Sequence, residues 1–390
     1  MKKSTLLRVG AIAVSFAFVT AACGSDNDSS SSDTVVTADT AAAAGVTCNS
    51  VSIAFFGALS GDAGNLGKNI RAGADLAVSE FNTANPGCQV GLVDFDSQGD
   101  PAQAPALAQK AIDDKSILGI VGPAFSGESK AADPLFDAAG LALITPSATN
   151  EALNDNNWKV FHRALAGDDK QGPGIATYIS KTLAAAKVGV IDDASEYGKG
   201  LADIVKTTLG AAVVASDSID PKAADFSAAV SKMKAAAPDA IFYGGYYAEA
   251  GKLAKQLRDA GVTATLVFGD GVKDQGYIDA AGPAADGSII TCTCADGASN
   301  AEFAAAYTAK FPGETPQTYG AEAYDAAKAF LAAIAAGKTD RAGVLEFLGT
   351  YDAAGVTKQI KWDATGEVAG NAVYAYKVDA GKIVSLGLIK

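Results

Sequence analysis

The chain has 390 residues, 49% of them hydrophobic, and a formal net charge of −13 at neutral pH. That length can fill two domains of ordinary size. A protein this acidic repels a phosphate backbone, which excludes nucleic-acid binding by electrostatic attraction, and the surplus acid favours solubility.

The first 22 residues have the pattern of an export signal. A basic leader, MKKSTLLR, precedes a run of 14 mostly apolar residues, VGAIAVSFAFVTAA, which is too short for a comfortable transmembrane helix. The run ends at TAAC, which resembles the lipobox of bacterial lipoproteins. This resemblance implies that residues 1–22 are a lipoprotein signal peptide and that Cys23 is lipidated and becomes the new N-terminus. The alternative is simple secretion, with cleavage near Ala22.

Residues 23–47 contain few large apolar side chains and cannot form a core. We expect a flexible tether with a root-mean-square span of about 25–30 Å. The folded part should then begin near Cys48 and work outside the cytoplasm. The predicted localisation is therefore an exported protein, lipid-anchored at the outer face of the cell membrane or in the periplasm.

Four further cysteines indicate disulfides, because an even number is typical of exported proteins. Cys48 and Cys88 each precede an expected strand, and a bridge between them is reasonable if the two strands are parallel neighbours. Cys292 and Cys294 flank one residue, so they form either a strained bridge or two free thiols. We expect no metal site and no cofactor, since His162 is the only histidine and no second cysteine pair has metal-binding spacing.

From residue 51 the chain alternates apolar runs of four to seven residues with segments of helical spacing. This alternation predicts an α/β protein whose parallel sheets are covered by helices on both faces. The runs are too many for one comfortable sheet, so we expect two Rossmann-like lobes. The boundary should lie in WKVFHRALAGDDKQGPG, with a new helix after Gln171. Three helical segments between residues 301 and 355 lack strands of their own, so the chain must cross back to the first lobe. Hinged lobes suit closure on a ligand.

Small hydroxyl residues follow the expected strand in GLALITPSATN, where Pro146 ends the ladder. They form either a simple turn or a ligand site, because ligands of open parallel sheets bind beyond the carboxyl ends of the strands. Ser126, in GPAFSGES, stands where the next helix begins. It is either a plain N-cap or, with the free N–H groups of that helix, part of a carboxylate site.

The second half of the chain repeats this arrangement. Tyr197, the pair Tyr246 and Tyr247, and Asp270 each follow an expected strand. Together with the first-lobe motifs they suit a zwitterion held between lobes, whose carboxylate needs hydroxyls and N–H groups and whose ammonium needs an acid. The glycine-rich loop GALSGDAGNLGK does not have the spacing of a nucleotide-binding loop.

Several motifs in order resemble the leucine/isoleucine/valine-binding family of ABC-transporter substrate-binding lipoproteins: GALSGDAGNLG, GPAFSGES, ITPSATN, ALAGDDKQGP, YGKGLA, DFSAAVSKMK, YGGYYAEAG, FGDGV and KWDATG. The resemblance runs from about Val51 to the C-terminus. It implies a type I periplasmic-binding-protein fold with three hinge crossings. Lobe 1 would comprise residues 48–167 and 295–368, and lobe 2 residues 168–294 and 369–390.

The resemblance also implies a role for each site residue. Ser126 and the Thr149 backbone N–H would hold the ligand carboxylate. The Ser147 carbonyl, the Thr149 hydroxyl and Asp270 would hold the ammonium, with Ala148 in the same loop. The remaining ligand-binding residues would close over the ligand from lobe 2 or shape its side-chain pocket: Tyr197, Tyr246, Leu66 and Phe125.

Three positions depart from the family pattern. Asp270 stands where members often carry Glu, which keeps the charge but alters its reach. Leu66 stands where members often carry an aromatic residue, which loosens side-chain selectivity. A disulfide found in some relatives cannot form, because Gly99 and Phe125 replace its cysteines.

The expected function is therefore a receptor that binds a branched-chain or similar aliphatic amino acid and delivers it to the permease subunits of an ABC importer. We expect a monomer. Alternatives are a receptor of the same fold for an amide, a urea or an aromatic acid, or a sensor without transport. A hydrolase is not expected, because no nucleophile–base pair is evident and His162 is interpreted as structural. A transcription regulator lacks support, since no basic DNA-binding head is present.

Overall fold

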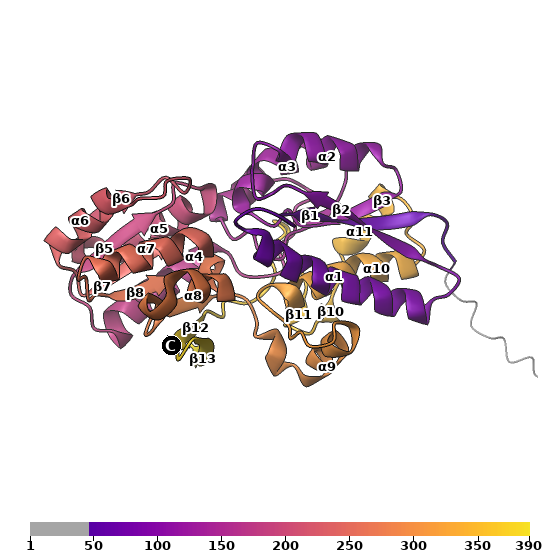
Figure 1. The fold of residues 1–390 in the computed structure, drawn as a ribbon. Coiled ribbons are helices and arrows are strands. Elements are labelled where there is room, and N and C mark those ends of the chain that lie inside the picture. The colour runs from indigo at the N-terminus through magenta and orange to yellow at the C-terminus, as the bar shows by residue number, and fades with distance from the viewer. Residues whose placement is uncertain (1–46) are drawn as a thin grey trace, which may run out of the picture. The chain divides into compact units, whose positions relative to one another are not determined.

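Two largely parallel β-sheets organise the chain in the computed structural model, which describes residues 47–390 (Figure 1). The expected signal peptide, Cys23 and nearly all of the tether lie outside the described residues. Among the described residues, no helix is both long enough and apolar enough to cross a membrane.

The first sheet has four parallel strands in the order β2-β1-β3-β4. Its strands are β1 (Val51–Gly57), β2 (Val90–Asp96), β3 (Ile117–Val121) and β4 (Leu143–Ile144). The register of β1 with β2 begins at Val51 opposite Val90, so the residues before the two strands lie side by side. There Cys48 and Cys88 form a disulfide with their Cα atoms 4.6 Å apart, which confirms that pairing.

Helices cover both faces of this sheet (Figure 1). They are α1 (Gly64–Ala84), α2 (Ala104–Asp113), α3 (Ser126–Ala138), α10 (Gly320–Ala335) and α11 (Arg341–Leu348). Successive side chains of β1 point to opposite faces. Phe55 lies in the same core cluster as residues of α1 and α10, whereas Phe56 packs edge-on against Phe136 of α3. The strand is therefore buried on both sides, as its continuous apolar sequence predicts.

The second sheet has seven strands in the order β13-β12-β9-β8-β7-β5-β6. They are β5 (Val188–Asp192), β6 (Val213–Ser218), β7 (Ala240–Gly244), β8 (Thr265–Phe268), β9 (Ile289–Cys292), β12 (Tyr374–Asp379) and β13 (Lys382–Leu388). The five strands from β9 to β6 are parallel, and β12 pairs antiparallel with both β9 and β13. Its helices are α4 (Asp168–Thr177), α5 (Glu196–Leu209), α6 (Ser227–Ala236), α7 (Tyr247–Asp259) and α8 (Gln275–Ala281).

The chain passes three times between the two sheets: after β4, after β9 and before β12. The second passage leads to α9 (Ala301–Lys310), α10 and α11, and the third follows the short strands β10 (Ala353–Ala354) and β11 (Gln359–Ile360). α10 packs against α1 so closely that a Cβ on Gly73 would lie 1.9 Å from the Gly320 carbonyl oxygen. The expected α/β architecture, with late helices returning to the first sheet, is thus confirmed.

Three local details bear on the sequence predictions. The helix expected after Gln171 begins earlier, at Asp168, because two acidic residues in its first turn suit the positive end of a helix. Cys292 and Cys294 are joined in a disulfide where the second passage begins. His162 is buried and its Nδ1 contacts the carbonyls of Leu143 and Val160. Burial lowers its pKa to about 4, consistent with a structural, neutral histidine.

Helix α3 buries two acidic side chains in the first lobe. Glu128 accepts hydrogen bonds from Ser97 Oγ and from the Phe125 backbone N–H. Asp133 is fully buried, and neither of its carboxyl oxygens forms a hydrogen bond within residues 47–390. Burial, reinforced by the nearby Glu128, raises the pKa of Asp133 well above its usual 3.8. The folded state therefore holds the Asp133 carboxyl neutral.

Asp133→Asn should stabilise the protein, and the gain should grow with pH. Above pH ~4 the unfolded chain loses the Asp133 proton that the folded state retains. The free energy of unfolding then falls by at most ~1.4 kcal/mol per pH unit for this group. Asparagine has the same shape and does not ionise. Urea unfolding should show a larger gain for the variant at pH 8 than at pH 5.

The exposed Asp113 on α2 provides the matched control, because Asp113→Asn replaces a carboxyl group by an amide at a position that is in contact with water. Its effect should be small and nearly independent of pH. An Asp133→Asn variant whose gain is the same at both pH values would show that Asp133 is ionised in the folded protein.

Candidate functional site

The predicted site residues converge at the carboxyl ends of the two sheets. A small cavity is lined by Ala124 and Tyr319 together with six residues singled out in the sequence: Leu66, Phe125, Ser126, Ser147, Tyr197 and Tyr246. They come from α1, the start of α3, the loop after β4, the start of α5 and the loop before α7. Segments far apart in sequence, from Leu66 to Tyr319, therefore meet, as expected for ligand binding at parallel strand ends.

One wall of the cavity is apolar and aromatic. Leu66 is fully buried, and the ring of Phe125 meets the ring of Tyr246 edge-on with centroids 5.3 Å apart. Tyr197 lies 5.3 Å from Tyr246 on the other side. This wall offers a ligand hydrophobic contact without a charged partner.

The loop after β4 presents a free backbone donor. The N–H groups of Ser147 and Ala148 both donate to Thr145 Oγ1, and that of Asn150 donates to Ser126 Oγ. The Thr149 N–H forms no hydrogen bond within the described residues. Ser126 is the first residue of α3, whose N-terminal N–H groups favour an anion. A carboxylate could thus be held by Thr149 N–H and Ser126.

Both backbone groups of Ala148 form hydrogen bonds within the protein. Its N–H donates to Thr145, and its carbonyl accepts from Arg163 Nη1 at 3.1 Å. By contrast, the Ser147 carbonyl accepts no hydrogen bond within the described residues, and its hydroxyl donates to the Ala124 carbonyl at 2.6 Å. Ser147 can therefore accept a donor from a ligand through its carbonyl, and Ala148 contributes mainly to the shape of the loop.

Buried oxygen acceptors without donors gather beside this loop. Asp270 lies two residues after β8 and is fully buried. Tyr197 donates its hydroxyl to Asp270 Oδ1 at 2.5 Å, and Oδ2 forms no hydrogen bond within the described residues. Asp168, at the start of α4, forms none at either carboxyl oxygen in residues 47–390. Thr149 Oγ1 and Gln171 Oε1 are likewise buried without a hydrogen bond among residues 47–390. Leaving so many buried polar atoms unpaired is costly, which indicates a site built for donors.

The electrostatics of the two acids agree with this interpretation. Burial raises the pKa of Asp270 above its usual 3.8, and burial together with the nearby Asp270 raises the pKa of Asp168 well above that value. Neither carboxylate forms an ion pair within the described residues. A cationic group with several N–H donors would satisfy both acids and restore their ionised forms.

Sequence reasoning missed three residues that the structure brings to the site: Asp168, Gln171 and Tyr319. The motif ALAGDDKQGP contains the first two, but at a helix start their polarity is ordinary. Tyr319 lines the cavity with a positive φ of 68°, a conformation that costs energy for a residue with a Cβ and often occurs at functional sites. That strain is not visible in the sequence.

Polar contacts also join the N-terminal parts of helices from the two lobes. Asn65 of α1 donates to the Tyr247 hydroxyl of α7 at 3.3 Å and to Asp274 at 2.9 Å. Lys130 of α3 pairs with Glu196 of α5 at 2.8 Å, although this exposed ion pair contributes little energy.

The sequence profile of the family described as "Periplasmic binding protein" matches residues 50–382. The Leu/Ile/Val-binding protein BraC3 of Rhizobium johnstonii is 31% identical over 353 residues, which cover 86% of this chain and 93% of that protein. The chain belongs to the Leu/Ile/Val-binding family of type I periplasmic binding proteins, whose members bind solutes.

Two solved structures agree with this assignment. The branched-chain amino acid transporter substrate-binding protein LivJ of Streptococcus pneumoniae, in complex with isoleucine, is 31% identical and has a TM-score of 0.79. The leucine-binding protein LivK of Thermotoga maritima is 27% identical with a TM-score of 0.80. The match covers 86% of this chain for LivJ and 87% for LivK, and in both cases 99% of the solved chain.

Proposed function

We propose that this protein is an extracytoplasmic receptor for a branched-chain or similar aliphatic L-amino acid, which it delivers to the permease subunits of an ABC importer. One observation carries the ligand class. The Thr149 N–H, which has no partner within the described residues, lies in one polar cluster with the buried carboxyl groups of Asp168 and Asp270, because Asp168 interacts with both Thr149 and Asp270. Only a ligand with a negative and a positive end satisfies both.

The carboxylate of the amino acid would accept from the Thr149 N–H and the Ser126 hydroxyl. Its ammonium has three donors, which would reach the Ser147 carbonyl, the Thr149 hydroxyl and Asp270. Asp168 lies so near Asp270 that Asp270 raises its pKa. Asp168 would therefore share the positive charge of the ammonium with Asp270. Charge-assisted hydrogen bonds of this kind are the strong ones in proteins.

The side chain of the ligand would pack against the apolar wall formed by Leu66, Phe125 and Tyr246. That wall contains no charged group, which favours leucine, isoleucine or valine over polar amino acids. Tyr197 and Tyr246 would close over the ligand from the second lobe. The site would bind and release its ligand unchanged, and we propose no enzymatic activity.

The rest of the proposal concerns how the receptor works in the cell. The protein would be a monomer held at the outer face of the membrane by lipid on Cys23. Its lobes, residues 48–167 with 295–368 and residues 168–294 with 369–390, would open and close about the three passages of the chain. The similarity to the isoleucine complex of LivJ supports the same ligand class here.

A thermal-shift screen of the purified protein against the twenty common amino acids tests this function. A ligand that binds only the native state raises the unfolding temperature. Leucine, isoleucine or valine should give the largest shifts, and calorimetry should give a single site per chain. If no amino acid shifts the transition while an amide, a urea or an aromatic acid does, the proposed ligand class is wrong.

Asp270→Asn should weaken amino-acid binding by roughly 2–5 kcal/mol, because the buried ammonium loses its charged partner. Ser126→Ala should cost less, about 1–2 kcal/mol, since the backbone N–H groups remain. Folding should be preserved in Asp270→Asn, because burial already disfavours the ionised carboxylate. Titration calorimetry checks the order of the two effects.

The exposed Asp279 on α8 offers a matched control, and Asp279→Asn should bind as the wild type does. Unchanged affinity of Asp270→Asn for every amino acid that binds would contradict the proposed ammonium site.

The anchor makes a separate prediction. Cys23 should be the first residue of the mature protein and carry lipid. Cys23→Ser should release a soluble protein that still binds its amino acid, because Cys23 lies far outside the folded residues in sequence. Mass spectrometry of the mature chain decides, and an unmodified Cys23 inside a longer chain would refute the anchor.

A further inference from the structure

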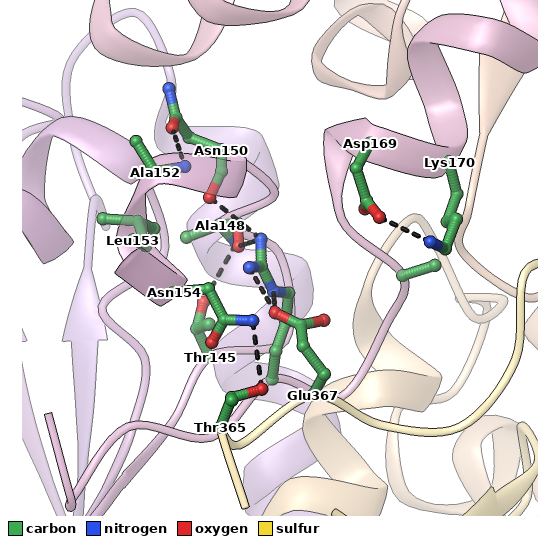
Figure 2. A network of polar contacts seen from close by, with 12 residues as sticks. Thr145, Ala148, Asn150, Ala152, Leu153, Asn154, Asp169, Lys170, Thr365 and Glu367 are labelled. Atoms are coloured by element: carbon green, nitrogen blue, oxygen red, sulfur yellow. Dashed lines mark hydrogen bonds and ion pairs between the residues drawn. The ribbon is translucent and has the colours of Figure 1, made fainter. Parts of the chain in front are cut away.

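The buried guanidinium of Arg163 binds two carbonyls of the loop after β4. Arg163 has 1% of its surface exposed, and its Nη1 donates to the carbonyls of Ala148 and Asn150, each at 3.1 Å. Its Nε donates to Glu367 Oε1 at 2.9 Å, and its Nη2 pairs with the same oxygen. Figure 2 shows the carbonyls of Ala148 and Asn150 on one side of this network and Glu367 on the other.

Arg163 is itself fixed by the residues around Glu367. Its backbone N–H donates to the Gly366 carbonyl at 2.9 Å, and its own carbonyl accepts from Trp362 Nε1 at 2.8 Å. Gly366 has a positive φ of 82°, and a Cβ there would lie 2.0 Å from the Phe161 carbonyl oxygen. The motif KWDATG, none of whose residues lines the cavity, thus forms a turn that binds the backbone of Arg163.

The hydrogen bond from Arg163 to the Ala148 carbonyl also sets the direction of the next N–H, that of Thr149. A trans peptide is planar, so the carbonyl of one residue and the N–H of the next point in opposite directions. Arg163 draws the Ala148 carbonyl toward itself and therefore aims the Thr149 N–H away from itself. That N–H is the donor of the loop that has no partner within the described residues.

We infer that Arg163 is a positioning residue that orients the Thr149 N–H toward the carboxylate of the bound amino acid. It acts through the Ala148 peptide without touching the ligand. A guanidinium suits this task because its rigid fork can hold two carbonyls and a carboxylate together, whereas a lysine ammonium is a point charge on a flexible stem. The inference rests on the proposed function, in which Thr149 binds the ligand carboxylate.

The test compares L-leucine with L-leucinamide, which keeps the ammonium and the side chain but replaces the carboxylate by a neutral amide. Arg163→Lys retains the positive charge and loses the fork. It should weaken leucine binding roughly 10- to 100-fold, the loss expected for a charge-assisted hydrogen bond. Leucinamide should lose much less, so the preference for leucine over leucinamide should fall. General damage to the fold would weaken both ligands equally.

Arg341→Lys is the matched control. Arg341 also uses its guanidinium to hold backbone carbonyls in the first lobe, those of Ala111, Ile112, Asp114 and Ile117, but at the opposite end of β3 from the cavity. This variant should keep the wild-type preference for leucine. If Arg163→Lys does not fold, Glu367→Gln decides. That change lies at a side chain with 22% exposure, and it should lower the preference in the same direction by loosening the guanidinium.

Three outcomes are distinguishable. A reduced preference in Arg163→Lys or Glu367→Gln, but not in Arg341→Lys, supports the positioning role. Leucine binding by the wild type with an unchanged preference in the variants overturns that role and leaves the proposed function standing. Wild-type protein that binds no aliphatic amino acid overturns both.

Discussion

The candidate site depends on the carboxyl groups of Asp168 and Asp270, which are buried without a cationic partner among the described residues. Asp168 and Asp270 come from the start of a helix and the end of a strand, and neither forms an ion pair within the described residues. Burial of an unpaired charge is costly, so the protein alone holds these groups toward their neutral forms. On the proposed function, a ligand ammonium would reverse that preference, because it would pair with the ionised forms of both carboxyl groups.

Some backbone groups of the loop after β4 form hydrogen bonds within the protein, and others do not. Toward the interior, the Ala148 and Asn150 carbonyls face one guanidinium, and the Thr149 carbonyl accepts from the Asp168 N–H at 2.8 Å. Among the described residues, the Thr149 N–H and the Ser147 carbonyl of this loop form no hydrogen bond, and Ser147 lines the cavity. Because every peptide carries a donor and an acceptor that need partners, satisfying one side of the loop internally fixes what the other side offers.

The sequence was sufficient for the parts of this arrangement that depend on local patterns. Alternating apolar runs predicted the parallel sheets. Strand-end positions singled out Ser126 and Tyr197, which line the cavity, and Asp270, which accepts a hydrogen bond from Tyr197. It was not sufficient where a residue acts through distant partners. Arg163 looks like an ordinary basic residue in KVFHRAL, and its partner Glu367 lies 204 positions away. The start of α4 was placed too late because the sequence alone does not show that Asp168 and Asp169 form the first turn of that helix.

The distribution of the site between the lobes explains how closure can be tied to binding. The N–H donors that suit a carboxylate belong to the first lobe, at Thr149 and the start of α3. Asp270, which suits the ammonium, follows a strand of the second sheet, and Tyr197, at the start of α5, donates its hydroxyl to that carboxyl group. On the proposed function, a zwitterion is short enough to satisfy both only when the two sets lie together. A ligand lacking either charge would leave one lobe with buried, unpaired polar groups, and closure on it would be disfavoured. Selection for an amino acid and closure of the lobes would then follow from the same pair of interactions.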